Sequence, residues 1–384
     1  MTDLIIEQAR SYFDALVKSR FIEMFGCIDL FAQKSDWIPI GKVGTILTGS
    51  TPKTNEPSYW DGNLKWITPA ELTSDSFIIK DTERKITEEG RRSCTLNLLE
   101  PGVVLLSSRA PIGKVAIVGS EMYCNQGFKN IKCSSNLNNV YLYVLLKNNT
   151  EYLNSLGRGA TFKEISAKIV ENICIPVPPV DLQNQFVEFF KQVDKSKVIF
   201  EKEVARYDDL IKSRFIEMFG TVRDNNLSLP IMKMGDIVEI RNGRDYKTIQ
   251  NDNGKYPVYG TGGIITHADD YLCPENTVII GRKGTINNPI LVKEKFWNVD
   301  TAFGIICDQN VLNPIYYFWF CKQYDFTQHN KATTIPSLVK ADLQKISVIV
   351  PDKERQDEFA SFVKQVDKSK LMLFESLKNI APNN

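Results

Sequence analysis

Two short segments that occur twice constrain the fold more than any other feature of the chain. KSRFIEMFG at 18–26 recurs at 212–220, 194 positions later, and KQVDKSK at 191–197 recurs at 364–370, 173 positions later. Each repeat therefore runs from KSRFIEMFG through a long body to KQVDKSK, and the first body is 21 residues longer than the second. Because a single hydrophobic core seldom grows beyond about 250–300 residues, we expect the 384 residues to form two copies of one domain.

The two bodies resemble each other much less than the segments that connect them. Their tails, ENICIPVPP at 171–179 and QKISVIVPD at 344–352, align at the offset of 173. The apolar run before Arg109 aligns with Val278-Ile279-Ile280 before Arg282. Near the start of the bodies, an alignment pairs Pro39, Lys42, Gly44 and Ile46 with Pro230, Lys233, Gly235 and Ile237. A repeated frame with diverged bodies is typical of a protein whose halves share a scaffold but recognise different things.

The connecting segments have the hydrophobic spacing of coiled-coil helices, with steps of three and four. The seam of the central segment comprises Phe186, Phe190, Val193, Phe200, Val204, Tyr207, Ile211, Phe215 and Met218. The corresponding seam residues near the two ends of the sequence are Ile6, Phe13, Val17, Phe21 and Met24, and Phe359, Val363, Val366, Leu373, Leu377 and Ile380. Lys197 and Lys370 fall at equivalent seam positions. If the halves are related by a pseudo-twofold axis, the terminal helices lie antiparallel to the central one.

The central helix, expected over 182–220, would be roughly 57 Å long at about 1.5 Å per residue. This pattern fits two roles: a ruler that holds two bodies apart, or a helical hairpin that merely packs them. Within the bodies, β-rich runs at 103–106, 115–118, 278–280 and 290–292 are separated by Gly, Pro and Asn turns, and helical patterns cover 138–148 and 311–322. The predicted class is α+β, with two mixed bodies and long antiparallel coiled-coil helices between them. The predicted domains are a helix at 1–26, bodies at 27–181 and 221–354, and helices at 182–220 and 355–384.

Composition limits the partners and the compartment. The net charge of +1 counts against a dedicated nucleic-acid domain, but basic residues cluster at 101–133 and 278–297. No run of about 18 apolar residues could span a bilayer, and the first ten residues carry charges where a signal peptide needs an apolar core. We therefore expect a cytoplasmic protein with no membrane partner. The eight scattered cysteines form no C-x-x-C pair, so reduced thiols acting as small hydrophobes are expected.

The sequence lacks the motifs of a catalytic centre. An adenine methyltransferase needs an N/D-P-P segment, for which Asn287-Asn288-Pro289-Ile290 is only a turn-like substitute. Gly260-Thr261-Gly262-Gly263 lacks the flanks of a methyl-donor site and predicts a tight loop. Asp352-Lys353-Glu354 stands at a helix start, where acids complement the helix dipole without a metal. His267 and His329 neighbour no ligand set. We therefore predict no catalytic residue, no cofactor and no metal.

Several motifs resemble the specificity subunits of type I restriction–modification systems, and the resemblance covers nearly the whole chain. YWDGNLKWITPAEL at 59–72, SSRAPIGKVAI at 107–117, CNQGFKNI at 124–131 and ISAKIVENICIPVPPVDLQNQF at 165–186 are similar to a first target-recognition domain and its helical spacer. YPVYGTGGIITHADDYL at 256–272, VIIGRKGTI at 278–286 and LVKADLQKISVIVPDKERQDEF at 338–359 are similar to a second subtype.

The resemblance implies a non-catalytic protein that reads a bipartite, asymmetric site in double-stranded DNA. Each recognition domain would read one half, and the helices would fix the gap. It also implies two copies of an adenine methyltransferase subunit along the helices and a motor–nuclease subunit joining that core. Two alternatives stay open: a self-contained DNA methyltransferase or nuclease with a degenerate site, and a coiled-coil adaptor that binds only proteins.

Recognition loops need Arg, Lys, Asn, Gln or Thr to reach phosphates and base edges, and Gly for close backbone approach. In the first body the candidates are Ser108, Arg109, Lys114, Arg158, Thr161 and Lys163. In the second they are Arg241, Arg244, Tyr246, Lys247, Arg282, Lys283, Lys331, Thr333 and Thr334.

The alignment puts Arg109 and Arg282 at equivalent places, which favours a job common to both bodies. Either they anchor phosphates or they brace their own turns. Arg244, Tyr246 and Lys247 have no counterpart in this alignment and are either half-site-specific readers or part of a solvated loop.

Overall fold

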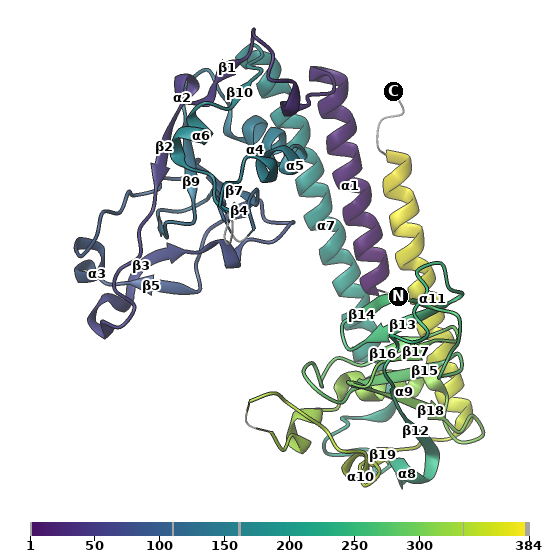
Figure 1. Cartoon of the computed structure of the whole chain (residues 1–384). Coiled ribbons are helices and arrows are strands. Elements are labelled where there is room, and N and C mark those ends of the chain that lie inside the picture. Colours follow the sequence, from purple (N-terminus) through teal and green to yellow (C-terminus); the bar gives the residue numbers. More distant parts are fainter. Residues whose placement is uncertain (1, 110, 160–162, 333, 381–384) are drawn as a thin grey trace. The chain divides into compact units, whose positions relative to one another are not determined.

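The computed structural model describes residues 2–109, 111–159, 163–332 and 334–380 (Figure 1). The chain divides into two compact units, and the division falls within two of its helices. The first unit comprises Arg10–Val198, and the second comprises the described residues of Met1–Ala9 and Ile199–Asn384.

The first unit is a mixed body with one long helix at either end. Its α-helices are α1 (Thr2–Phe25), α2 (Ile40–Val43), α3 (Glu88–Arg92), α4 (Asn139–Asn148), α5 (Thr150–Ser155), α6 (Ala167–Glu171) and α7 (Val180–Phe219), of which α1 and α7 also extend into the second unit. Its strands are β1 (Ile38–Pro39), β2 (Gly44–Thr48), β3 (Trp60–Ile67), β4 (Ile78–Ile79), β5 (Arg84–Ile86), β6 (Val104–Leu106), β7 (Val115–Val118), β8 (Tyr123–Cys124), β9 (Lys129–Cys133) and β10 (Cys174–Ile175).

The second unit repeats this composition. Its further helices are α8 (Met234–Ile237), α9 (Pro314–Gln323), α10 (Lys340–Leu343) and α11 (Lys353–Ile380). Its strands are β11 (Ile231–Lys233), β12 (Val238–Asn242), β13 (Tyr256–Gly260), β14 (Gly263–Ala268), β15 (Thr277–Gly281), β16 (Ile290–Val292), β17 (Trp297–Asn298), β18 (Ala302–Cys307) and β19 (Ser347–Ile349). The turn predicted at Gly260-Thr261-Gly262-Gly263 joins β13 to β14.

The sheets of the two units have matching strand orders. The larger sheet runs β2-β9-β6-β7-β4 in the first unit and β12-β18-β15-β16 in the second. A smaller sheet runs β5-β3-β8 and β14-β13-β17, with a parallel β3–β8 pair matched by a parallel β13–β17 pair. A two-stranded pair closes each body, β1-β10 and β11-β19. The predicted α+β class with an internal repeat is confirmed.

The first residues of the two bodies align differently in the structure from the pairing that the sequence predicted. The amide of Ile40 donates to Ile173 O over 2.9 Å, and the amide of Met234 donates to Ile346 O over the same distance. A Cβ on Gly41 would touch Glu171, just as one on Gly235 would touch Gln344. These matches have the offset of 194 seen in KSRFIEMFG, so pairing Gly44 with Gly235 was wrong by three residues. A single proline and a few small residues cannot determine the register of so short a segment.

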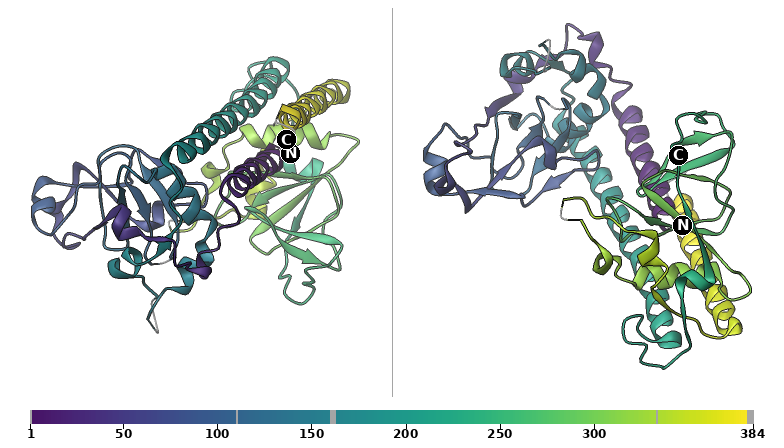
Figure 2. Two further views of the ribbon diagram at one scale, coloured as in Figure 1. Left: turned by 90° about the horizontal axis from the view of Figure 1, so that it is seen from above. Right: turned by 60° about the horizontal axis from the view of Figure 1, so that its bottom comes forward.

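The long helices meet through the predicted seam. Phe186, Val204, Ile211 and Phe215 are among its buried members, whereas the predicted seam residue Ile6 is only half-buried and its neighbour Ile5 is buried instead. Within the second unit, Phe200 lies 6.0 Å from Phe374 and Phe215 lies 5.5 Å from Phe359, measured between ring centroids. Residue numbers rise on α7 as they fall on α11, so these helices are antiparallel. Figure 2 shows each as one continuous helix.

A cluster of four aromatic rings joins the helices to the body in each unit. Phe21 stacks on Tyr141 at 5.5 Å, and Phe25 and Phe186 pack edge-on around them. In the second unit the same arrangement is made by Phe215, Phe219, Tyr316 and Phe359. The FIEMF of the repeated segment supplies the first two rings in both units. The repeated segment therefore builds the same helix–body joint twice.

Candidate nucleic-acid interface

In the first unit, two predicted loops and one further loop gather around the turn 124–127, which we call the first hub. The amide of Ser50 donates to the carbonyl at its start over 3.0 Å, and the amide of Ser108 donates to the carbonyl at its end over 2.7 Å. The carbonyl of Ser108 accepts the amide of Ile165 over 3.0 Å. Three loops that are distant in sequence, around residues 50, 108 and 163, therefore converge on one turn.

In the second unit, the turn 298–301 forms an equivalent second hub. The amide of Arg244 donates to its first carbonyl over 3.0 Å, and the amide of Arg282 donates to its last carbonyl over 2.8 Å. The carbonyl of Arg282 accepts the amide of Leu338 over 2.9 Å. The backbone of the two units is therefore matched residue by residue around the hubs.

This match corrects the predicted equivalence of Arg109 and Arg282. Arg282 makes the backbone contacts of Ser108, whereas Arg109 pairs with Glu164 in a β-bridge equivalent to the one between Lys283 and Ser337. Arg109 therefore corresponds to Lys283. Neighbouring residues of an extended segment point to opposite sides. Aligning Arg109 with Arg282 therefore paired two side chains that point in opposite directions.

The match between the units also reveals a recognition loop that was not predicted from the sequence. Gly49 and Gly243 both precede the hub contact, and a Cβ on either would collide with a hub carbonyl oxygen. Glycine is therefore required at both places, and Lys53 corresponds to Lys247. The prediction that Arg244, Tyr246 and Lys247 lack counterparts is wrong: their counterparts are Ser50, Pro52 and Lys53. The offset of 194, continued from KSRFIEMFG, would have identified TGSTPKT at 48–54 as the match of NGRDYKT at 242–248.

Tryptophan side chains hold this loop in both units. Trp66 Nε1 donates to Ser50 O over 3.1 Å, and Trp297 Nε1 donates to Arg244 O over 3.0 Å. In the first unit, Trp60 Nε1 also donates to Lys53 O over 3.1 Å, and the Arg84 guanidinium lies 3.8 Å from the centroid of its ring. The indoles come from different strands, so the two bodies reached the same support by different sequences.

Side chains around the first hub form a charged cluster. Lys129 is nearly buried, and its Nζ lies 3.0 Å from Glu164 Oε1 and 3.2 Å from Ser108 Oγ. Arg109 Nη1 is 4.0 Å from the other oxygen of Glu164. Ser108 is fully buried. Lys114 donates its ammonium hydrogens to the carbonyls of Pro69 and Leu72.

In the second unit, some candidates also have partners inside the body. Arg241 contacts Glu239 Oε1 through two nitrogens and donates to Leu272 O over 2.8 Å. Lys331 Nζ lies 2.5 Å from Asp342 Oδ2, and this contact lowers the pKa of the Asp342 carboxyl. Arg282 donates to Asp300 O over 3.4 Å.

The remaining candidates are more open. Tyr246 is half-buried and packs on a small apolar cluster with Trp297. Thr161 and Thr333 lie outside the described residues. Besides the paired Lys331, the exposed candidates are Arg158, Lys163, Arg244, Lys247, Lys283 and Thr334, and the newly identified Lys53 is exposed as well.

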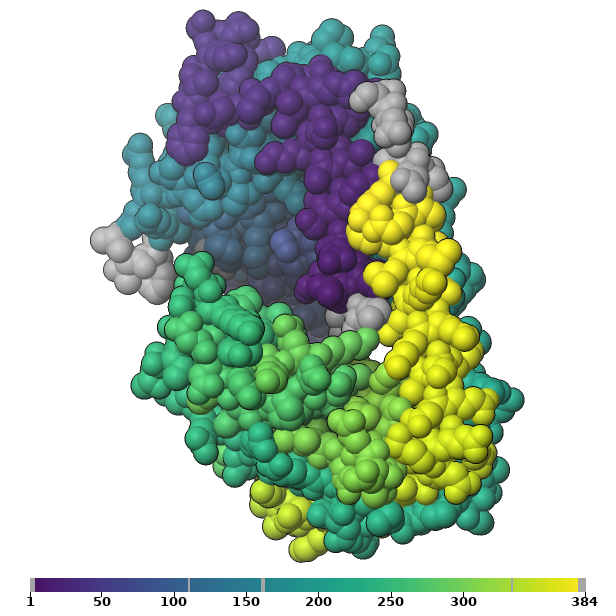
Figure 3. Space-filling model, turned by 90° about the vertical axis from the view of Figure 1, so that its right-hand side faces the viewer, coloured from purple at the N-terminus to yellow at the C-terminus, as the bar shows by residue number. Residues whose placement is uncertain are grey.

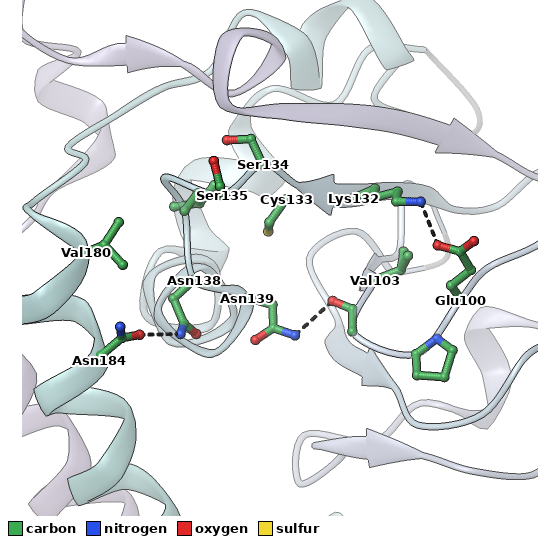
Figure 4. Close-up of a pocket in the computed structure, with 13 residues that line it drawn as sticks. Glu100, Val103, Lys132, Cys133, Ser134, Ser135, Asn138, Asn139, Val180 and Asn184 are labelled. Atoms are coloured by element: carbon green, nitrogen blue, oxygen red, sulfur yellow. Dashed lines mark hydrogen bonds and ion pairs between the residues drawn. The ribbon is translucent and has the colours of Figure 1, made fainter.

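Away from the hubs, the polar groups serve the fold. In the hollow of Figure 4, Lys132 pairs with Glu100 at 2.6 Å, and Asn138, which caps α4, donates to Asn184 of α7 at 3.0 Å. His329 shares a 2.7 Å hydrogen bond with Tyr324. The described part of the chain holds no group of three His, Cys, Asp or Glu residues arranged for a metal. None of its helices is long and apolar enough to cross a membrane.

Comparison with known proteins identifies the class to which this architecture belongs. A model of the type I restriction modification DNA specificity domain matches the chain twice, at residues 34–206 and 230–380. The chain belongs to this family. It is a specificity subunit of a type I restriction–modification system, which confirms the predicted non-catalytic recognition role and does not favour a self-contained methyltransferase or nuclease.

Individual specificity subunits align with this chain over most of its length. The type I restriction enzyme MjaIX specificity subunit of Methanocaldococcus jannaschii is 28% identical over 412 residues, which cover 95% of this chain and 93% of that protein. The EcoprrI specificity subunit of Escherichia coli is 20% identical and covers 86% of this chain and 87% of its own length. A solved S subunit from M. genitalium aligns with 92% of this chain and 97% of its own, at 14% identity and a TM-score of 0.47.

Proposed function

We propose that this specificity subunit reads a bipartite, asymmetric site in double-stranded DNA, with one half-site for each hub. The observation that supports this most directly is the matched backbone of the two hubs together with their unmatched exposed side chains. A common frame gives both bodies the same approach to a duplex, while the side chains on it differ, as where the half-buried Ser50 of the first body corresponds to the exposed Arg244 of the second. We assign the recognition domains to 27–181 and 221–354, and the spacer helices to 1–26, 182–220 and 355–384.

We further propose which side chains meet the DNA. Phosphate contacts carry most of the affinity and are made by exposed cations. Exposure supports this role for Arg158 and Lys163 in the first body, and for Arg244, Lys247 and Lys283 in the second, with Lys53 added to the first set. We assign the same role to Arg109, which is half-buried beside Glu164. Thr334 is exposed as well. We keep Thr161 and Thr333, which lie outside the described residues, as candidates from the sequence alone.

Candidates with internal partners would act indirectly. Ser108, Lys114, Arg241 and Lys331 hold the loops in place through the contacts described above, and Arg282 braces the second hub. Tyr246 is half-buried against the small apolar cluster of Trp297, in the same loop as the exposed Arg244 and Lys247.

Equivalent exposed apolar residues on two of the helices indicate where partner subunits bind. Val198 and Ile199 on α7 are exposed, and so are Leu371 and Met372 on α11, at the equivalent places 173 positions later. Figure 3 shows α11, coloured yellow, open along one face. Two equivalent exposed apolar sites suit two copies of one partner, so we assign them to two adenine methyltransferase subunits, which a motor–nuclease subunit joins. The helices would set the gap between half-sites, and the complex would act on DNA in the cytoplasm.

The experiment is footprinting of the assembled complex, formed from the full chain and its methyltransferase subunit, on duplexes selected from a random library. Two protected segments should flank a gap without base preference. One continuous protected site would contradict the proposal. The chain alone, incubated with labelled methyl donor or with magnesium, should leave the DNA unmodified and uncut.

A further inference from the structure

The hub turns carry one position at which the two bodies differ in hydrogen-bonding chemistry. Because Ser50 and Arg244 bind the first hub carbonyls, and Ser108 and Arg282 bind the last, the hubs align residue by residue. The third residue is Gln126 in the first unit and Asp300 in the second, and both side chains are exposed. These two residues were absent from the loops singled out by sequence.

Each of these residues is hydrogen-bonded to a neighbouring recognition loop. The Thr51 hydroxyl donates a hydrogen bond to Gln126 Oε1, which ties Gln126 to the loop of Lys53. Lys129 Nζ donates to the backbone carbonyl of Gln126 over 3.1 Å. The carbonyl of Asp300 accepts a hydrogen bond from the Arg282 guanidinium. Each hub is therefore tied by hydrogen bonds to a loop that carries an exposed cation, Lys53 in the first unit and Lys283 in the second.

The two side chains can form hydrogen bonds with different DNA bases. A glutamine amide has a donor and an acceptor side by side, which matches N7 and N6 of adenine in the major groove. A carboxylate only accepts, so it matches the N4 amino group of cytosine and is repelled by phosphates and by the acceptor edges of guanine. A carboxylate amid cations that face DNA weakens binding unless a base donor meets it, so its presence favours specificity over affinity.

We propose that Gln126 and Asp300 are specificity-determining residues at equivalent places, Gln126 reading an adenine in one half-site and Asp300 a cytosine in the other. This inference rests on the proposed reading of one half-site by each hub. The surrounding cations fix the register of the duplex, and the hub side chain then meets a base edge.

The test replaces one hydrogen-bonding pattern by the other without changing side-chain size. The full chain carrying Asp300→Asn, assembled with its methyltransferase subunit, is used to select duplexes from a random library. At one base pair of one half-site, the preference should move from cytosine to adenine, by roughly 5- to 150-fold for one bidentate contact. The other half-site should be unchanged. Gln126→Glu should produce the opposite change, from adenine to cytosine, in the other half-site.

Two further variants make the outcome decisive. Asp300→Ala should lose the cytosine preference without gaining another, and Asp236→Asn, an exposed acid at the start of α8, should leave the selected sequences unchanged. Unchanged base preferences in Asp300→Asn, or a change of affinity equal for all sequences, would overturn the inference. Failure of the unmodified complex to select two half-sites would instead overturn the proposed function itself.

Discussion

Arg109 is held by a carboxylate that also binds a nearly buried lysine. Glu164 lies between Arg109 and Lys129, and its backbone forms an isolated β-bridge with that of Arg109. We expect Arg109→Ala to weaken binding to all duplexes alike and to reduce the slope of log affinity against log salt by about 0.9, the value of one phosphate contact. Binding titrations of the complex at several salt concentrations measure both.

The control for this variant is Lys168→Ala, which removes an exposed cation from α6 of the same unit. It should leave the salt slope unchanged. A loss confined to one base pair in Arg109→Ala would show that Arg109 reads a base instead of anchoring the backbone.

The cysteines should differ sharply in reactivity. Burial raises the pKa of Cys124, Cys273 and Cys307 to about 12, whereas Cys27 is exposed. The thiolate is the reactive form, so about one part in ten thousand of a thiol with this pKa is reactive at pH 8. We expect an alkylating reagent to modify Cys27 in the native chain and to spare the three buried thiols. Mass spectrometry of peptides reads this directly, and native labelling of Cys273 would mean that its body opens readily.

For single residues, the sequence predicts which residue types occupy the recognition loops, but it does not determine which way each side chain points. Arg109 and Arg282 follow similar apolar runs, yet only the hydrogen bonds to the hubs reveal that Ser108 matches Arg282. Likewise, Lys114 looks like any loop lysine until Pro69 and Leu72 are known to lie within reach of its ammonium group. Long-range backbone pairing decides these matters, and a single sequence does not record it.

The start of one body helix in each unit is held by a fully buried glutamine from a long helix. Gln356 accepts the amide of Asn313, the residue that caps α9, over 2.8 Å, and donates to Val311 O and Pro351 O over 3.0 and 2.8 Å. Gln183 makes the equivalent three bonds at Asn138, which caps α4. The repeated frame therefore extends to individual buried hydrogen bonds.

We expect Gln356→Leu to destabilise the second unit by about 3 kcal/mol, because an amide and two carbonyls lose their partner in the interior. Hydrogen exchange should accelerate in α9 while α4 keeps its protection, and Gln183→Leu should produce the opposite pattern. Gln365→Leu, at an exposed position of α11, is the matched control and should alter neither helix. Equal acceleration of both helices by Gln356→Leu would mean that the units do not unfold separately.

The long helices and the strands with continuous apolar runs were predicted well, and the two-residue strands were not. A helix expected over 182–220 is α7 over Val180–Phe219, and the run 115–118 is β7. The two-residue strands β1 and β10 carry no pattern of their own and exist only because they pair with each other. Burial at every third or fourth residue is a local pattern in the sequence, so the seam predicts the helices. Strand pairing joins residues that are distant in sequence, so no local pattern predicts it.

At the scale of the whole molecule, the duplication explains how one chain presents two different reading surfaces. Each unit has its own hydrophobic core, one around Phe215 and Tyr316 and the other around Phe21 and Tyr141. Mutations at one hub therefore need not disturb the other body. This independence lets the exposed side chains diverge while the backbone of both hubs stays the same.

Independent hubs predict that one half-site can be lost without the other. The combined variant Arg244→Ala, Lys247→Ala and Lys283→Ala removes three exposed cations around the second hub and leaves the first untouched. Footprints of the assembled complex should lose protection over one half-site and keep it over the other. The salt slope should fall by about 0.9 for each phosphate contact removed. The paired change Lys233→Ala and Lys345→Ala, in the same unit but outside the three loops, should keep both footprints. If both half-sites lose protection together in the triple variant, the two bodies bind as one surface and the assignment of one half-site to each hub is wrong.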